Sequence, residues 1–290
     1  MPEIELPQGT IRYEDTGGQG PAIVFLHGLV MDSTMWRDVV PALAVDHRCV
    51  LPTLPLGAHR IPMNRDADLG IWGMVNLVAD FLEALDLVDV TLVVSDWGGG
   101  MLLTHVGRDE RVGRLVICAA EAFDNYPPGL PGKLAALACR APGGIGLALR
   151  QLRIGWLRRT PLLLGWMAKH GVPDDLVREW TAGGLASKGV RRDVKKFGST
   201  RFDKAQTIAA TEALRRFDHP ALVLWSPEDR VMPLEHGRRL AGLLPKGMLV
   251  EIADAYVLLS LDQPALVAQH LRAFLAATSD ESVPAHAPTD

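Results

Sequence analysis

The sequence predicts an α/β fold in which a mostly parallel central sheet is flanked by helices and carries an inserted helical cap. Short apolar runs of strand length alternate with periodic segments of helix length. This alternation stops near residue 122 and resumes near residue 216. A chain of 290 residues, 48% of them hydrophobic, is long enough for one large α/β core with one insertion.

The strands of the core are predicted from buried apolar runs and one alternating segment. Residues 9–15 (GTIRYED) alternate in side-chain character and suit an antiparallel edge strand. The other predicted strands are 21–27, 47–52, 89–95, 112–120, 220–226 and 248–254. Helices are predicted between them at 33–44, 70–86, 98–107, 233–243 and 264–277. The sheet is therefore built from both ends of the chain.

The interval from 122 to 215 contains no convincing strand, several Gly and Pro breaks, and helical periodicity elsewhere. We therefore predict a core of residues 1–121 and 216–278, a helical cap of residues 122–215, and a disordered tail of residues 279–290. Residues 131–216 hold 17 basic and 6 acidic side chains. This excess fits either solvated helix faces attracted to an acidic core or a cap that attracts an anionic substrate.

Composition narrows the classes of partner. A formal charge of -4 gives no basic field, so no nucleic-acid partner is expected. The first ten residues do not resemble a signal peptide, and no apolar run approaches the roughly 20 residues of a membrane span. The three cysteines show no metal-binding or redox spacing. We expect a cytoplasmic protein with a small-molecule substrate, no membrane partner, no metal and no cofactor, and a homodimer remains one option.

The strongest local signal is VVSDWGGG at 93–100, where a buried strand runs into a helix through a turn rich in glycine. A strained strand-turn-helix of this kind lifts one side chain above the carboxyl edge of a sheet, here Asp96. The alternative is that Asp96 only caps the helix that follows it, which is a common fate of aspartate. The segment by itself does not decide between these two interpretations.

Two further segments support the first interpretation. The loop FLHGLVMDSTMW at 25–36 and the turn LVLWSPEDRVMP at 222–233 occur in the order expected around such a turn. Together, the three segments resemble the α/β-hydrolase fold superfamily. The resemblance implies that Asp96 stands at the nucleophile position and that Asp229 is the acidic member of the catalytic triad. It also implies that the backbone N–H groups of Leu29 and Trp97 form the oxyanion hole.

An aspartate nucleophile followed by tryptophan resembles the haloalkane dehalogenases and some epoxide hydrolases, which attack carbon and form an alkyl ester. In this branch the indole of Trp97 helps to hold a departing halide. A second donor would have to come from a cap tryptophan, namely Trp156, Trp166 or Trp180. Epoxide hydrolases use cap tyrosines instead, and here Tyr126 stands only at the entrance to the cap.

The largest departure from the family lies in IADAYVLLSLDQP at 252–264. Aligned on its later Asp and Pro, this loop places Val257 where the family has its catalytic histidine and Tyr256 just before it. The general base is therefore missing. Among the other histidines, His236 and His170 are the remaining candidates for a substitute, and His27 is expected to support the oxyanion loop. The predicted substrate-binding residues are His27, Trp97, Tyr126, Trp156, Trp166, Tyr256 and Val257.

A second acid, Glu121, ends the strand 112–120, where some dehalogenases keep their acidic residue. If Asp96, Glu121 and Asp229 share one pocket, repulsion between their charges raises at least one pKa. The leading hypothesis is a cofactor-free hydrolase that acts on a carbon–halogen, epoxide or ester bond of a small apolar molecule, with Asp96 as nucleophile. The alternatives are a lyase, isomerase or cyclase that uses Asp96 as an acid or base, and a ligand-binding protein that has lost catalysis.

Overall fold

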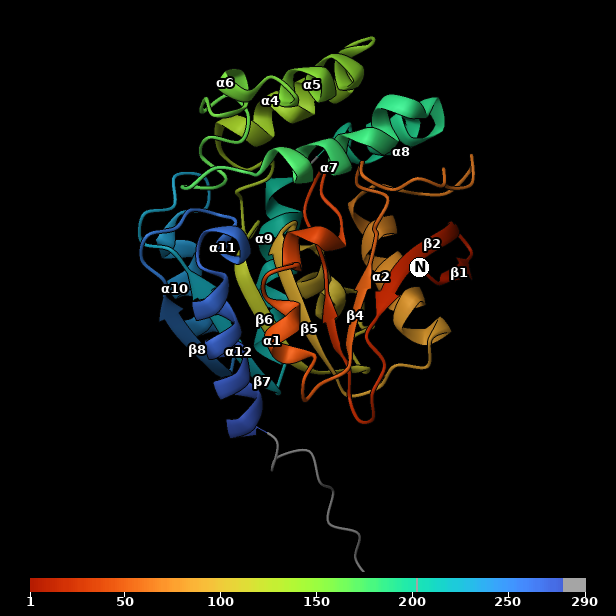
Figure 1. Cartoon of the computed structure of the whole chain (residues 1–290). Coiled ribbons are helices and arrows are strands. Elements are labelled where there is room, and N and C mark those ends of the chain that lie inside the picture. Colours follow the sequence, from red (N-terminus) through yellow and green to blue (C-terminus); the bar gives the residue numbers. More distant parts are fainter. Residues whose placement is uncertain (202, 279–290) are drawn as a thin grey trace, which may run out of the picture.

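The computed structural model describes residues 1–201 and 203–278, and its centre is an eight-stranded sheet (Figure 1). The strand order is β1-β2-β4-β3-β5-β6-β7-β8. β1 and β2 are antiparallel to their neighbours, and the strands from β4 to β8 are parallel. The strands are β1 (Glu3–Leu6), β2 (Gly9–Asp15), β3 (Ile23–Phe25), β4 (Cys49–Pro52), β5 (Val90–Asp96), β6 (Val112–Ala120), β7 (Pro220–Trp225) and β8 (Lys246–Glu251). The predicted fold class is confirmed.

The central strands are buried along their whole length because helices cover both faces of the sheet, as expected for parallel strands. The helices beside the sheet are η1 (Ser33–Trp36), α1 (Val40–Leu43), α2 (Ile71–Ala84), η2 (Gly98–Leu102), α3 (Leu103–Val106), α10 (Leu234–Leu243), α11 (Leu259–Asp262) and α12 (Pro264–Thr278). β5 lies in the middle of the sheet, so its carboxyl end is enclosed by neighbouring strands.

Three local predictions were wrong. The edge strand β1 was missed, because four residues with two exposed glutamates carry little apolar signal. The predicted helix 33–44 is two short helices, because Pro41 stands at the first turn of α1 and restarts the helix there. The predicted helix 98–107 begins as the 3-10 helix η2, whose three glycines pack too closely against their surroundings for side chains.

The described residues of the interval from 122 to 215 form helices joined by loops and contain no strand. Its elements are α4 (Gly129–Arg140), α5 (Gly144–Leu152), α6 (Gly155–Arg158), α7 (Asp174–Ala186), α8 (Lys188–Gly198), α9 (Lys204–Glu212) and η3 (Ala213–Arg216). α4 to α8 form a layer above the sheet, whereas α9 and η3 contact η2 and α3 beside the sheet (Figure 1). The layer above the sheet therefore ends before α9, and the assignment of 122–215 as one cap stays a prediction.

Buried polar contacts join α8 to the core. Asp193 has no accessible surface and accepts hydrogen bonds from the Met63 backbone N–H at 2.8 Å and from the Arg192 side chain. His59 Nε2 lies 3.3 Å from the same carboxylate. A buried charge needs such partners, so this cluster fixes α8 over the loop that follows β4.

Cys49, Cys118 and Cys139 are buried free thiols. Each described helix is either too short or too polar to cross a bilayer. The disorder predicted for residues 279–290 concerns a segment outside the described residues.

Candidate active site

Asp96 stands at the end of β5 in a strained backbone conformation. Its φ is +60°, in the left-handed region that non-glycine residues rarely occupy. The strand pairing between β5 and β6 is irregular at this point, and the Glu121 backbone N–H donates to the Asp96 carbonyl oxygen at 3.0 Å. Strain of this kind persists only where the surrounding structure enforces it, and it turns the carboxyl group away from the sheet.

The side chain of Asp96 does not cap the helix that follows. The residue at the cap of η2 is Trp97, which makes no side-chain capping bond. Asp96 Oδ2 instead accepts a hydrogen bond of 3.0 Å from the backbone N–H of Leu29, in the loop after β3. The capping alternative therefore does not describe this aspartate, and the structure brings together two residues that the sequence placed in one site.

Glycines make this close approach feasible. A Cβ on Gly28 would lie 2.0 Å from Asp96 Oδ2. A Cβ on Gly98 would lie 2.2 Å from the Glu121 carbonyl oxygen, and one on Gly99 would overlap the Trp97 ring. Gly28 therefore lets backbone approach the carboxyl group of Asp96, whereas Gly98 and Gly99 let the turn pack against the Glu121 backbone and the Trp97 ring.

Trp97 is almost fully buried beside Asp96, with 1% of its surface exposed. Its ring packs edge-on to Phe197 of α8, with a centroid separation of 6.2 Å. The indole Nε1 is buried and has no hydrogen-bond partner. A buried N–H without a partner is costly and is a common feature of sites that hold an acceptor from a ligand.

Two more carboxyl groups lie near enough to Asp96 for its charge to act on them. Burial, and then the charge of Asp96, raise the pKa of Glu121 well above its ordinary value. Burial also raises the pKa of Asp229 to about 7, and the charge of Asp96 adds to this effect. Asp229 Oδ1 accepts from the backbone N–H groups of Val231 and Met232, while its buried Oδ2 has no partner.

Burial raises the pKa of Asp96 itself to about 6, and the hydrogen bond from Leu29 opposes that rise. The pKa values of all three acidic groups are therefore raised, chiefly by burial, and the charge of Asp96 adds to the rise at Glu121 and Asp229. Within the described residues, no group of three or more His, Cys, Asp or Glu side chains has the arrangement that would hold a metal ion.

The loop after β8 buries an aliphatic side chain at the position of the family's histidine. Val257 has no accessible surface, so it contacts no space of water size and its predicted role in substrate binding is not supported. Tyr256 is partly exposed, with the Arg230 guanidinium 5.3 Å from its ring centroid. Asp262, which the sequence offered only as an alignment anchor, accepts hydrogen bonds from the backbone N–H groups of Lys169, His170 and Tyr256.

His27 is a structural residue and not a substrate contact. Its Nε2 accepts from the Leu54 backbone N–H at 2.8 Å, so its Nδ1 carries the proton and donates to the Gly28 carbonyl oxygen. Burial lowers the pKa of His27 to about 4, so the ring is neutral. It holds the loop that presents Leu29, as expected, but the prediction that it binds substrate needs correction.

Neither candidate for a replacement base contacts Asp96. His170 is exposed and bonds to Asp254 at 3.1 Å, on the outside of the loop after β8. His236 lies in α10 with its ring packed against Phe123, and burial lowers its pKa. Its Nδ1 is buried without a partner. The structure thus leaves Asp229 as the acid–base group that is coupled to Asp96 and has an unpartnered oxygen.

The predicted aromatic contacts divide into three groups. Trp156 is 74% exposed on α6, which contradicts a place in the substrate pocket. Trp180 is buried, but its indole N–H donates to Thr34 Oγ1 at 2.8 Å. Trp166 is half-buried against the core, and Tyr126 is buried with its hydroxyl donating to the Glu121 carbonyl oxygen. Trp97, Tyr126 and Trp166 therefore keep positions that are compatible with a substrate.

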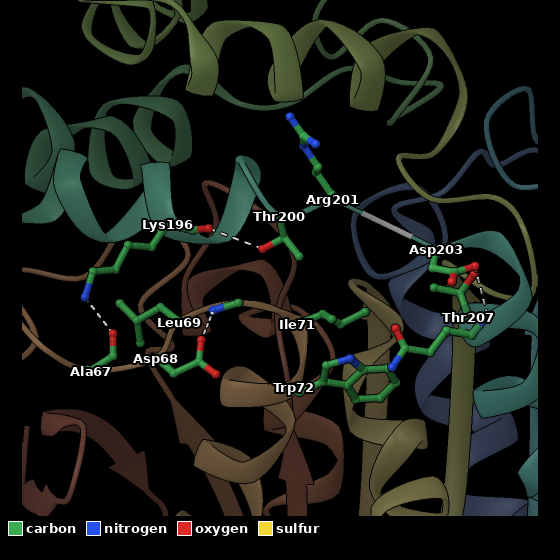
Figure 2. Close-up of a pocket in the computed structure, with 12 residues that line it drawn as sticks. Ala67, Asp68, Leu69, Ile71, Trp72, Lys196, Thr200, Arg201, Asp203 and Thr207 are labelled. Atoms are coloured by element: carbon green, nitrogen blue, oxygen red, sulfur yellow. Dashed lines mark hydrogen bonds between the residues drawn. The ribbon is translucent and has the colours of Figure 1, made fainter.

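A cavity of about 640 Å³ that the sequence did not indicate opens away from Asp96, between the start of α2, the end of α8 and the start of α9 (Figure 2). Most of its polar side chains are already engaged. Lys196 Nζ donates to the carbonyl oxygens of Arg65 and Ala67, Asp68 accepts from Gly70, and Asp203 caps α9. Nothing in this lining points to a ligand.

Comparison with known proteins places this fold and site in one family. The model of the alpha/beta hydrolase fold family matches residues 21–264, which is most of the chain. The chain therefore belongs to the α/β-hydrolase fold family. The match covers the loop of Leu29, the turn of Asp96 and the turn of Asp229.

Two named relatives match parts of the chain. The chain is 37% identical over 97 residues to a haloalkane dehalogenase of Mesorhizobium japonicum, covering 33% of this chain and 30% of that protein. It is 33% identical over 126 residues to a cis-3-alkyl-4-alkyloxetan-2-one decarboxylase of Shewanella oneidensis, covering 42% and 39%. These matches span less than half of either relative.

Among solved structures, the fold is similar to that of a haloalkane dehalogenase variant from Agrobacterium tumefaciens, with a TM-score of 0.72. The two sequences are 20% identical, and the match covers 95% of this chain and 96% of the other. At this identity the likeness concerns the fold alone.

Proposed function

We propose that this chain is a cofactor-free enzyme that attacks a carbon atom of a small apolar substrate with Asp96 and carries an alkyl ester on that side chain. One observation supports this most directly. Asp96 Oδ2 accepts the Leu29 N–H, whereas Oδ1 has no partner among the described residues. The unpartnered oxygen can bond to carbon, and the held oxygen then becomes the carbonyl oxygen of the ester.

The same hydrogen bond serves the second half of the reaction. When water adds to the ester carbon, negative charge develops on Oδ2, where the Leu29 N–H already points. With a pKa of about 6, Asp96 is mostly ionised above pH 7 and can act as a nucleophile there.

We propose that Asp229 replaces the missing histidine as the base that activates this water. A pKa of about 7 suits a general base at neutral pH, and its Oδ2 is unpartnered. Water transfers a proton to Asp229 as its oxygen bonds to the Asp96 carboxyl carbon. The tetrahedral intermediate then expels the alcohol, which takes that proton from Asp229. The second proton of the water stays on the Asp96 carboxyl group, and its transfer to Glu121 or to solvent returns Asp96 to a carboxylate.

The leaving group of the first step is best matched by oxygen. A halide would have the unpartnered Trp97 indole, but Trp156 is exposed and Trp180 is engaged, so a second donor has to be Trp166. An oxygen leaving group can also receive a proton from Glu121, because burial raises the pKa of this carboxyl group well above its ordinary value and so favours its protonated form. Epoxides, and esters attacked at their alkyl carbon so that a carboxylate leaves, therefore rank above haloalkanes as substrates.

A second candidate function is a lyase, and the burial of Val257 favours it. The relative from Shewanella oneidensis is named for decarboxylation of a four-membered lactone. If Asp96 opens such a ring at its alkyl carbon, the ring oxygen leaves as a carboxylate. Loss of carbon dioxide then supplies the electron pair for a carbon–carbon double bond as the bond to Asp96 breaks. This sequence needs no water and no base.

One experiment tests whether Asp96 bonds to a substrate carbon, which is the step that the hydrolase and lyase proposals share. The protein is incubated with epoxides, activated esters, haloalkanes and β-lactones, and its intact mass is measured alongside Asp96→Asn and the exposed control Asp66→Asn. We expect an adduct or turnover with the wild type and the control, and neither with Asp96→Asn. If Asp96→Asn reacts as well as the wild type, the proposal fails.

A single turnover in H₂¹⁸O decides how the ester is released. Hydrolysis at the Asp96 carboxyl carbon places one solvent oxygen in that side chain. The mass of the peptide that contains Asp96 then rises by the difference between the heavy and the ordinary oxygen isotope. Release by elimination breaks the bond to substrate carbon and leaves the peptide unlabelled. A folded protein that binds a substrate analogue but gives neither adduct nor product would favour the ligand-binding alternative.

A further inference from the structure

The outer helical layer, which we define as α4, α5, α6 and their connections, contains no acidic side chain. From residue 125 to residue 173 the sequence has no Asp or Glu, although the whole chain carries a net charge of -4. The same stretch has seven Lys and Arg residues. α7 and α8 lie between this layer and the sheet, so it is the part of the described molecule farthest above the sheet (Figure 1).

This layer also exposes large apolar side chains. Six of the eleven exposed large hydrophobic residues in the described part of the chain lie here, namely Leu130, Leu137, Leu147, Ile154, Trp156 and Leu162. Leu137 and Leu147 are 61% and 57% exposed, and Trp156 is more exposed than either. A group of exposed apolar residues on one layer usually marks an interaction surface, whereas single exposed leucines do not.

Basic and apolar side chains alternate along the exposed faces. α4 exposes Leu130, Lys133, Leu137 and Arg140, whose spacing of three and four residues places them on one helical face. Its opposite face buries Cys139. α5 continues the pattern, with Leu147 and Arg150 exposed while Leu149 and Leu152 pack inward. The surface is therefore amphipathic in composition, although its helices are already packed on the molecule.

The exposed cations have no acidic partners in the described chain. Lys133, Arg140, Arg150 and Arg159 form no ion pair there, and Arg153 bonds only to Thr181 and a backbone carbonyl. Two cations of the stretch differ: Arg158 is buried and paired with Asp174, and Lys169 is paired with Glu228 and Asp254. The positive charge of the exposed face is thus left for an external anion.

We propose that this face docks on the surface of an anionic lipid bilayer. Leucine, isoleucine and tryptophan beside arginine and lysine are the side chains that enter the boundary between headgroups and acyl chains. Each Lys or Arg near such a surface strengthens partitioning by about fivefold. The docking needs no membrane-spanning helix, and it does not depend on the function proposed for Asp96.

Charge argues against a second copy of the chain as the occupant. A two-fold interface would bring this acid-free face against itself, so the unpaired cations of both copies would meet without a neutralising carboxylate. Nucleic acid would use the cations but would leave the exposed leucines and Trp156 without apolar partners. An anionic bilayer supplies both kinds of contact.

Vesicle co-sedimentation of the full chain tests the proposal. We expect binding to vesicles that mix phosphatidylglycerol with phosphatidylcholine and little binding to phosphatidylcholine alone. The triple variant Arg140→Gln, Arg150→Gln, Arg159→Gln should lose on the order of 100-fold in partitioning. The variant Leu137→Gln, Leu147→Gln, Trp156→Gln should lose at least about tenfold. All six positions are exposed, so the fold should tolerate both sets.

Matched controls change the same residue types on other faces. Val45→Gln with Val88→Gln removes exposed apolar groups, and Arg65→Gln with Arg215→Gln removes exposed charges. Both controls should bind vesicles like the wild type. A blue shift of tryptophan emission on binding, reduced in Trp156→Phe, would support insertion of this face.

Four results would overturn the proposal. The first is no binding to either kind of vesicle, and the second is an equal loss of binding in the controls and the face variants. The third is a dimer in light scattering that only the face variants dissociate, without vesicle binding, which would assign the face to a second copy. The fourth is binding to an acidic protein with no affinity for anionic vesicles.

Discussion

Two loops at the same edge of the sheet have opposite characters. The turn after β5 holds a strained, buried aspartate with one oxygen fixed by Leu29 and one unpartnered. The loop after β8, where the family has its histidine, buries Val257 and is organised by Asp262 through three backbone N–H groups. In the proposed reaction, Asp96 forms the ester at the first of these loops, and the second loop offers no histidine to clear it. The proposal therefore assigns bond formation and ester release to different residues, which variants can test separately.

The largest expected effect comes from disturbing the turn after β5. In Gly28→Ala the new Cβ would lie 2.0 Å from Asp96 Oδ2, so the carboxyl group must move. A displacement of about 1 Å typically costs on the order of 10²-fold in rate, and we expect at least that loss of adduct formation. Gly242→Ala is the control, because a Cβ at Gly242 meets nothing within 4 Å. Full activity in Gly28→Ala would show that the position of Asp96 does not matter.

The next effect comes from restoring the histidine. Asp229 Oδ2 is buried without a partner, and the family resemblance pairs this acid with the histidine, so we expect the ring in Val257→His to donate to it. If release is hydrolytic, the rate of ester clearance should rise by about 10²-fold, the lower range for a positioned base. The added volume in a buried site should cost about 1–3 kcal/mol of unfolding free energy.

Two control variants show whether faster ester clearance comes from the new histidine. Val257→Leu keeps an apolar group and should leave clearance unchanged, and adding Asp229→Asn to Val257→His should remove the gain. An unchanged rate in a folded Val257→His protein would favour release without water.

A smaller effect is expected from the residue that organises the loop after β8. Asp262→Asn replaces an acceptor of three backbone N–H bonds with a group that presents its own donor, in a buried position. The free energy of unfolding should fall by about 2 kcal/mol. Urea denaturation measures the change, with exposed Asp218→Asn as control. A fall no larger than in the control would mean that these bonds do not stabilise the loop.

The smallest expected effect is a pH-dependent gain from Asp229→Asn. The folded pKa of about 7 lies above the ordinary value of 3.8, so between these values the folded state binds the proton more tightly than the unfolded state. The contribution of Asp229 to stability therefore falls as pH rises from 4 to 7. The free energy of unfolding of Asp229→Asn should therefore exceed that of the wild type at pH 8 and lose this advantage near pH 4. The opposite trend would contradict the burial of an ionised Asp229.

Features that depend on neighbouring residues could be predicted from the sequence, whereas features that depend on contacts between distant segments could not. Seven of the eight strands could be predicted, because a buried strand is a local run of apolar residues. β1 was missed, since its pairing with β2 and not its composition makes it a strand. The proximity of Asp96 and Leu29 could be predicted only because their segments resemble a family in which the two loops meet.

The positions of the aromatic residues could not be predicted. Trp156 and Trp180 are the same residue type in helical segments, yet one is exposed and the other donates to Thr34. Which face of a helix is buried depends on the helices packed against it, and here those are other parts of the insertion. The prediction that His27 binds substrate was wrong for a related reason, because its hydrogen bonds to the backbone of Gly28 and Leu54 are known only from the folded chain.

By itself, the sequence determined the parallel sheet, the helical insertion and the glycine-rich turn at Asp96, because each is a pattern of neighbouring residues. Only the tertiary structure decided that Asp229 keeps an unpartnered oxygen and that Glu121 and Asp229 feel the charge of Asp96. It also decided that the acid-free helices face outward. Burial, charge coupling and exposure depend on which distant segments meet in space, and no local pattern of residues encodes them.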